Sequence, residues 1–315
     1  MIGFIVRRIG QAIIVLLGLT LLVFVMEHLL PGNIARAIIG PRATGPEIAA
    51  FNRANDLDRS VLYQYAHYLN QLIHGNLGFS YTLNRSVWNV LKAEVPRDLL
   101  LVGTSIALAV LIAVPVGVSQ AVKRNGLVDY AATSVSFLLY SMPSFALGLI
   151  LIQVFAIQFA ILPPEAPQSA GVLGLLAHPS GFVLPVATLT LSVYALFSRY
   201  MRSSAIDALA QDYIRTARAK GLPEHLVLWR HLVRNSLVPI ATLVGLSLPA
   251  VFTFGLVVEQ LFNFPGVGLQ YFTSATQTDY PTMLGITLLV GVATVAGSLL
   301  ADLAYAALDP RVRFS

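Results

Sequence analysis

The chain has 315 residues, of which 56% are hydrophobic and 11% are charged, and its mean hydropathy is +0.74. This composition leaves too little polar surface for an ordinary soluble domain, so it predicts an integral membrane protein. The net charge of +5 does not indicate nucleic-acid binding, because the basic residues are scattered between apolar runs. The absence of cysteine excludes thiol nucleophiles, disulfides and thiolate metal sites.

The first apolar run covers residues 9–30 and follows a short basic start. A cleaved signal peptide would have a shorter apolar core and a small-residue cleavage site, and Pro31-Gly32-Asn33 is not such a site. We therefore predict an uncleaved first span in residues 1–30, with the N-terminus in the cytoplasm.

A polar stretch, residues 31–97, follows the first span and predicts an extracytoplasmic segment. It contains turn signals at its start and a helical pattern in residues 60–73. The segment is too short to form an independent catalytic domain.

Five more apolar stretches occupy the remainder, residues 98–315, and most of them reach the length of about 20 residues that a membrane helix needs. With the first span they predict six transmembrane helices and both termini on the same side. That side is the cytoplasm, because basic residues concentrate in the loops on it, whereas the two short opposite loops, 162–181 and 260–282, contain none. The five stretches are 99–122, 130–159, 182–197, 237–258 and 283–307.

Prolines mark most of these spans. Each proline removes a backbone hydrogen bond and is expected to kink or unwind its helix, which is tolerated where other helices or a watery path satisfy the freed carbonyl. Ordinary use of proline in membrane helices is the alternative. The prolines are Pro115, Pro143, Pro185, Pro239 and Pro249.

Residues 206–235 lie between the fourth and fifth apolar stretches and predict a hairpin of two short helices. The first has an apolar stripe and ends near Gly221, which suits a left-handed cap because it lacks a Cβ. The second begins at Pro223. On pattern alone, a passive surface loop explains this segment equally well. The two apolar stripes consist of Ile206, Leu209, Tyr213 and Ala217, and of Leu222, Leu226, Trp229 and Val233.

The string Asp-Tyr-Ile-Arg-Thr-Ala-Arg-Ala-Lys-Gly in residues 212–221 resembles the coupling loop of ABC-transporter permeases. The closest likeness is to the peptide (oligopeptide, dipeptide and nickel) import family, dipeptide/oligopeptide permease B type. The general signature is Glu-Ala-Ala, three residues and Gly, and its closing Leu-Pro has a counterpart in Val238-Pro239 at a longer spacing. The resemblance assigns contact with an ATPase to Asp212, Tyr213, Arg215, Thr216, Ala217, Arg218 and Gly221.

Two further strings, in residues 141–145 and 259–268, resemble family strings, and so does the segment 57–80, so the resemblance covers nearly the whole chain. The first string, with polar residues of the fourth span, predicts a translocation path. The second predicts an outer motif of Glu259, Phe262, Pro265, Gly266 and Gly268. The predicted path residues are Ser141, Pro143, Ser144, Thr190, Tyr194 and Pro249.

Residues for catalysis are missing from the sequence. No Gly-Lys dipeptide occurs, which excludes a phosphate-binding loop of the GxxxxGK[ST] type, and the six histidines form no HExxH motif. A self-contained ion-coupled transporter is the alternative function. It would keep ionisable groups deep in the bilayer, whereas Glu27, Glu259 and Asp302 all fall near span ends.

By resemblance, the chain is an all-α, six-span permease subunit of an ATP-driven importer of peptides in the cytoplasmic membrane. The same resemblance implies a second homologous permease, two ATPase subunits and an extracytoplasmic solute-binding protein as partners. ATP and magnesium would bind to the ATPase subunits, and no cofactor or metal is expected on this chain. The solute stays open among dipeptides, oligopeptides, nickel chelates, glutathione and antimicrobial peptides.

Overall fold

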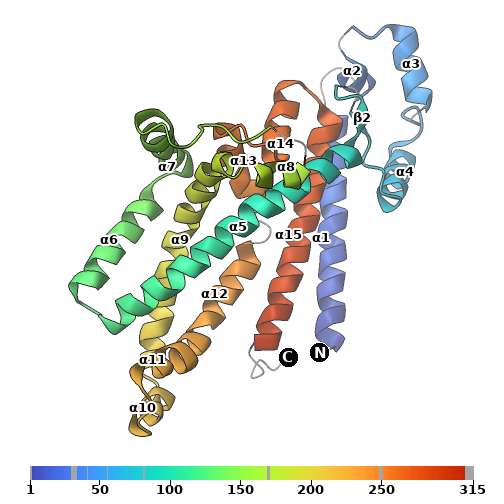
Figure 1. Cartoon of the computed structure of the whole chain (residues 1–315). Coiled ribbons are helices and arrows are strands. Elements are labelled where there is room, and N and C mark those ends of the chain that lie inside the picture. Colours follow the sequence, from blue (N-terminus) through green and yellow to red (C-terminus); the bar gives the residue numbers. More distant parts are fainter. Residues whose placement is uncertain are drawn as a thin grey trace.

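The computed structural model describes residues 2–29, 34–40, 42–54, 56–80, 82–168, 171–247 and 251–308, and these are helical almost throughout (Figure 1). The predicted all-α membrane fold is confirmed. Pro31-Gly32-Asn33, Pro249 and the C-terminal residues 309–315 lie outside the described residues. The first elements are α1 (Ile2–His28), α2 (Ile34–Ile39), α3 (Gly45–Ala54), α4 (Val61–Ile73), the antiparallel strands β1 (Phe79–Ser80) and β2 (Arg85–Ser86), and α5 (Val87–Val122).

The second part of the chain contains the remaining helices and two π-helical stretches. These are α6 (Leu127–Ser141), α7 (Ser144–Leu151), the π-helix η1 (Ile152–Gln158), α8 (Gly171–Ala177), α9 (Ser180–Leu209), α10 (Asp212–Ala219), α11 (Glu224–Leu226), the π-helix η2 (Val227–Val233), α12 (Arg234–Ser247), α13 (Val251–Leu261), α14 (Val267–Thr276) and α15 (Tyr280–Leu308).

Within the described residues, four helices are long and apolar enough to cross a membrane: α1, α5, α9 and α15. The helix α6 and the bent continuation formed by α7 and η1 make a fifth candidate span if they are counted as one broken span. Because residues 248–250 between α12 and α13 lie outside the description, the count of six spans stays a prediction.

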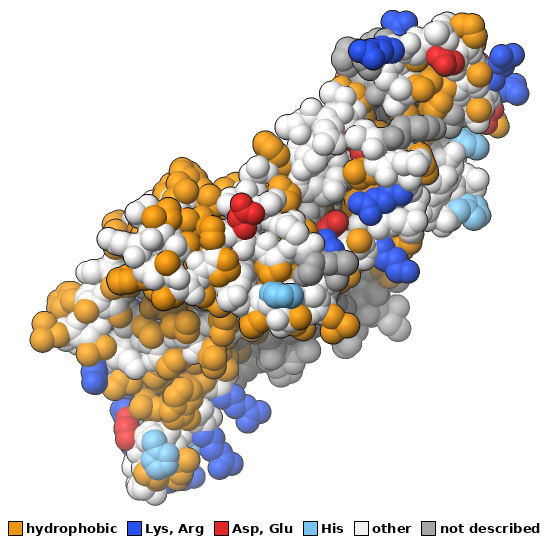
Figure 2. Space-filling model, turned by 45° about the horizontal axis from the view of Figure 1, so that its top comes forward, with side chains coloured by type: hydrophobic (Ala, Val, Ile, Leu, Met, Phe, Trp, Pro, Cys, Tyr) orange, Lys and Arg blue, Asp and Glu red, His pale blue; other side chains and the backbone are white. Residues whose placement is uncertain are grey.

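The two ends of the molecule differ in structure. The start of α1, the end of α15 and the hairpin at α10 and α11 lie at one end, and α2, α3 and α4 lie at the other (Figure 1). Figure 2 shows Lys and Arg side chains at the hairpin end and over the segment that contains α3, with hydrophobic side chains gathered over α6 and α7. This distribution is that of a protein whose middle faces lipid.

The core is the contact between α5 and α9. Apolar side chains of α5, among them Leu101 and Ile106, pack against Leu189 and Phe197 of α9 in one buried cluster. The helix α5 has 36 residues and is therefore ~54 Å long at 1.5 Å per residue, so it extends beyond the ~30 Å apolar core of a bilayer. It begins at Val87, which places the last part of the predicted outer segment, 31–97, within this helix.

The predicted span over residues 130–159 is not one straight helix. The helix axis bends by 107° between α6 and α7. Pro143 is the N-cap of α7, and because proline has no backbone N–H, it cannot continue the hydrogen-bond ladder of α6. By contrast Pro115, Pro185 and Pro239 lie inside unbroken helices, so the predicted unwinding at a proline occurs, among the described ones, only at Pro143.

The closeness of α5 and α9 can be tested at Gly117. A Cβ added there would lie 2.7 Å from the Met201 Cβ and 3.0 Å from the Arg202 backbone nitrogen. Gly117→Ala should therefore lower the free energy of unfolding by about 1–3 kcal/mol. Gly103→Ala is the matched control in the same helix, because its Cβ would meet open space and alanine favours a helix by about 0.5–1 kcal/mol. Thermal unfolding of each variant in detergent measures its change in stability. Equal changes in the two variants would contradict the close contact of α5 with α9.

Candidate functional site

The predicted hairpin is continuous with two long helices. The helix α9 ends at Leu209, and α10 begins at Asp212 after a two-residue turn. The expected single helix from Ile206 is therefore wrong at its start, since residues 206–209 are the last turn of α9. Gly221 follows the C-cap of α10 with a φ of 75°, so the expected left-handed position is confirmed.

One face of α10 is buried against the ends of the long helices. Ile214 and Ala217 are buried in a second apolar cluster together with Val118 of α5 and Met201 of α9. The predicted stripe was right about Ala217 but wrong about Tyr213, which is 37% exposed, because the turn before Asp212 breaks the helical register. The remaining residues of the predicted coupling set, Asp212, Arg215, Thr216, Arg218 and Gly221, are exposed.

The second arm of the hairpin is not a separate short helix. Pro223 is its N-cap, and α11, η2 and α12 then follow without a break. Of the predicted apolar stripe only Val233 is buried, while Leu222, Leu226 and Trp229 are exposed at 36%, 39% and 57%. The i→i+5 pattern of η2 winds the chain less per residue than an α-helix, which shifts the buried side to Val227 and Leu232.

An ion pair joins the two arms across the turn. The Arg218 guanidinium donates to both carboxylate oxygens of Glu224, with the shorter N–O distance at 2.6 Å. This contact lowers the pKa of Glu224 and raises that of Arg218. Both side chains are about half exposed, so solvent screening limits the stabilisation to a fraction of a kcal/mol. Gly221 rather than this pair therefore defines the turn.

A second ion pair ties the base of α9 to α6. Arg202 donates from Nε to Asp129 Oδ1 at 2.7 Å and from an Nη to Asp129 Oδ2 at 2.8 Å. Asp129 also accepts from the backbone N–H of Asn125 and from the Thr133 hydroxyl. The carboxylate is almost fully buried, with a relative exposure of 4%, and the bidentate geometry makes this a directional contact. It joins α6 to the helix that leads into the hairpin.

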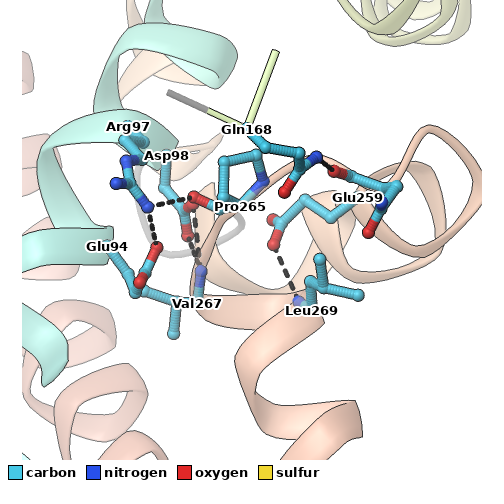
Figure 3. A network of polar contacts seen from close by, with 9 residues as sticks. Glu94, Arg97, Asp98, Gln168, Glu259, Pro265, Val267 and Leu269 are labelled. Atoms are coloured by element: carbon cyan, nitrogen blue, oxygen red, sulfur yellow. Dashed lines mark hydrogen bonds and ion pairs between the residues drawn. The ribbon is translucent and has the colours of Figure 1, made fainter. Parts of the chain in front are cut away.

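The outer motif lies at the opposite end and surrounds the start of α14 (Figure 3). Glu259 and Phe262 are fully buried, and Glu259 Oε2 accepts from the Leu269 N–H at 2.9 Å. Asp98 of α5 accepts from the Val267 N–H at 3.1 Å and 3.2 Å through its two oxygens. Two carboxylates from different helices therefore cap the N-terminus of α14, where the helix dipole favours negative charge.

Neighbouring polar groups hold the loop that precedes α14. Arg97 donates to Glu94 at 2.6 Å and to the Pro265 carbonyl at 3.2 Å, and Gln168 donates to the Asn263 carbonyl at 2.5 Å (Figure 3). We name the whole cluster the outer junction. It consists of Glu94, Arg97, Asp98, Gln168, Glu259 and the loop 262–266 with the first turn of α14.

Two glycines of the motif lie where the neighbouring atoms leave too little room for a larger side chain. A Cβ at Gly266 would overlap the carboxylates of Asp98 and Glu259, and a Cβ at Gly268 would overlap the backbone of Leu256. The residues of the motif predicted from the sequence lie in this junction, and Glu94, Arg97 and Asp98 were not predicted as their partners. Their spacing of three and four residues puts the charges on one helical face just before an apolar run, which is the signal that could have found them.

Comparison with known proteins gives the family. The family described as binding-protein-dependent transport system inner membrane component matches residues 113–314, and its N-terminal counterpart matches residues 1–102. The chain belongs to this family. It is 35% identical to the oligopeptide transport system permease protein AppB of Bacillus subtilis (strain 168) over 100% of both chains. It is 33% identical to the glutathione transport system permease protein GsiC of Escherichia coli (strain K12), again over 100% of both.

The chain is thus a multi-pass permease subunit of an ABC transporter, a class that works with ATPase and binding-protein partners. Permeases of this family translocate and do not catalyse, so the expectation that this chain is not an enzyme is confirmed. Dependence on a binding protein also disagrees with the alternative of a self-contained, ion-coupled transporter.

The described members of the predicted translocation path lie on different elements of this permease. Thr190 and Tyr194 are buried in the contact of α9 with α5, and Thr190 donates to the Ser105 carbonyl at 3.3 Å. Ser141 is exposed at the end of α6, and Ser144 begins α7 after the bend. Pro249 lies outside the described residues.

Asp98 should be necessary for the order of α14 in the permease. Asp98→Ala removes the acceptor of the buried Val267 N–H, which costs about 1–3 kcal/mol locally. We expect faster hydrogen exchange of the amides at 267–269, with a smaller change in Asp98→Asn, which keeps one acceptor oxygen. Thr276→Ala at the exposed end of α14 is the control. Unchanged exchange at 267–269 in Asp98→Ala would contradict the capping role.

Proposed function

We propose that this permease carries peptides, or solutes of similar size, inward across the cytoplasmic membrane, driven by ATP hydrolysis on its partner subunits. The names of its relatives support this solute class, since AppB is an oligopeptide and GsiC a glutathione transport permease. The partners are a second homologous permease, two ATPase subunits and an external solute-binding protein. Dipeptides, longer peptides and glutathione all fit the relatives' names.

One observation carries the coupling role: the hairpin is rigidly anchored on one side and exposed on the other. Ile214 and Ala217 are buried against α5 and α9, while Arg215, Leu226 and Trp229 are exposed. An exposed face that mixes charges with an aromatic side chain suits a protein partner. Closure of the ATPase dimer would then push directly on α9 and α12, because no flexible linker separates them from the hairpin.

Movement of the hairpin would also reach α6. The Arg202–Asp129 pair links α9 to α6, and α6 leads to the bend at Pro143. Ser141 and Ser144 flank this bend, so they stay our candidates for the translocation path. Such hydroxyl groups can hydrate a peptide without binding it tightly, and we assign selection of the solute to the external binding protein.

The coupling role can be tested at Gly221. Gly221→Val places a β-branched residue at a φ of 75°, which costs about 1 kcal/mol or more. It should tilt the second arm and lower both transport and permease-stimulated ATP hydrolysis. Gly75→Val is the matched control, because Gly75 has the same φ and also has open space around its Cβ position, but lies in the outer segment. Normal transport by an assembled Gly221→Val complex would show that the hairpin is a passive loop.

The orientation in the membrane is a separate test. A reporter enzyme that is active only in the cytoplasm should work when it is fused near Gly221 and fail when it is fused near Gln168. Lys and Arg are frequent in the hairpin and absent from the short loops 162–181 and 260–282, which supports this expectation. The reverse pattern would rule out both the cytoplasmic termini and the contact with ATPases.

A further inference from the structure

The outer helix α4 turns polar groups toward the protein. The Tyr65 hydroxyl lies 3.0 Å from the Thr20 Oγ1 and 3.3 Å from the Leu17 carbonyl, both in α1. Gln64 Oε1 lies 2.9 Å from His28 Nε2, at the outer end of α1. These hydrogen bonds fix α4 along the outer part of the first membrane span.

Large apolar side chains of α4 are exposed on another face. Leu62 is 80% exposed and Ile73 is 82% exposed, and their separation of 11 positions makes about three helical turns, so both lie on one face. Val61 and Tyr63 beside them are 62% and 49% exposed. A helix in water buries its apolar face and exposes its polar one. In α4 the polar side chains of Gln64 and Tyr65 instead bind α1, while Leu62 and Ile73 are exposed, with Asn70 on the same side.

The position of α4 identifies what covers this face. Leu17 and Thr20 lie inside the apolar stretch Arg7–Met26 of α1, so the groups that bind Tyr65 are at membrane depth. Figure 1 shows α4 beside the outer end of α1, whereas α3 lies farther out. On α1 itself Leu21, Leu22 and Met26 are about half exposed at the same level. The surface of α1 that faces lipid therefore continues onto α4.

The side chains at the start of α4 match the boundary between lipid tails and headgroups. The Arg59 guanidinium lies 6.0 Å from the centre of the Tyr63 ring, and Tyr63 stacks on His67. Tyrosine prefers this boundary because its ring is apolar and its hydroxyl is polar, and arginine can extend its charge to the headgroups.

We propose that α4 is an interfacial helix whose exposed face, with Leu62 and Ile73, is immersed in the outer leaflet of the bilayer. It anchors the extracytoplasmic segment to the membrane beside α1 and so holds that segment at a constant height above the translocating helices. The inference rests on the membrane insertion of α1 and, for the choice of leaflet, on the proposed orientation, and it is independent of the proposed coupling and solute.

Site-directed spin labelling tests this directly, because the chain contains no cysteine. Leu62→Cys, Ile73→Cys, Leu22→Cys and Ala50→Cys are labelled one at a time with a nitroxide, in the complete transporter in phospholipid nanodiscs. Leu22 on α1 is the lipid reference, and Ala50, exposed on α3, is the water reference. Collision with oxygen, which concentrates in lipid, is compared with collision with a water-soluble nickel chelate. Transport by each variant confirms that it is assembled.

Labels at Leu62 and Ile73 should give an oxygen-to-nickel collision ratio close to that at Leu22 and roughly tenfold above that at Ala50, since the polar chelate is excluded from apolar surroundings. A ratio like that at Ala50 would mean that α4 lies in water and would overturn the proposal. Protection from both reagents would mean that a protein subunit covers this face, and it would overturn the proposal equally.

Discussion

The close contact of α5 with α9 is the constraint on which the remainder of the structure depends. Gly117 lets the two backbones approach, and buried side chains such as Leu101 and Phe197 fill the contact on either side. In a bilayer the hydrophobic effect gives little drive for helices to associate, so a small residue that permits tight packing matters more than apolar character. Both candidate regions, the hairpin and the outer junction, are built on this pair.

The hairpin is rigid at one end of this pair because its parts have no free joints. The helix α9 passes into α10 through two residues, α11 passes into α12 without a break, and Ile214 is held against α5. Buried polar contacts strengthen the same end. Ser198 of α9 donates to Gln120 of α5, and Gln120 donates to Thr133 of α6. In the proposed coupling, a push on the hairpin would therefore be carried to three helices at once.

The outer junction is the counterpart at the other end of α5. Asp98 and Glu259 are buried carboxylates, which is tolerable because each accepts a backbone N–H at the start of α14. The described side chains around them supply one cation, Arg97, which is already bound to Glu94. The geometry of α14 thus depends on backbone donors and on two glycines rather than on opposite charges, and it connects α5 to α13 and α14.

Several features were determined by the sequence alone, because they follow from local properties. Long apolar runs are enough to predict helices in lipid, where every backbone group must bond within its own segment. Gly221 is enough to predict the left-handed turn, since it is the residue type that adopts this φ without strain. The strings 212–221 and 259–268 were enough to predict the family, and full-length relatives confirmed it.

Other features were decided only by tertiary structure. Asp98 is distant from Glu259 in the sequence, and only the packing of α5 against α13 brings their carboxylates to the same helix end. The exposure of Trp229 depends on a π-helical stretch that helical periodicity does not predict. The bend at Pro143 could not be told from the unbroken helices at Pro115 and Pro185. A proline removes one hydrogen bond in every case, and the neighbouring helices determine whether the chain then changes direction.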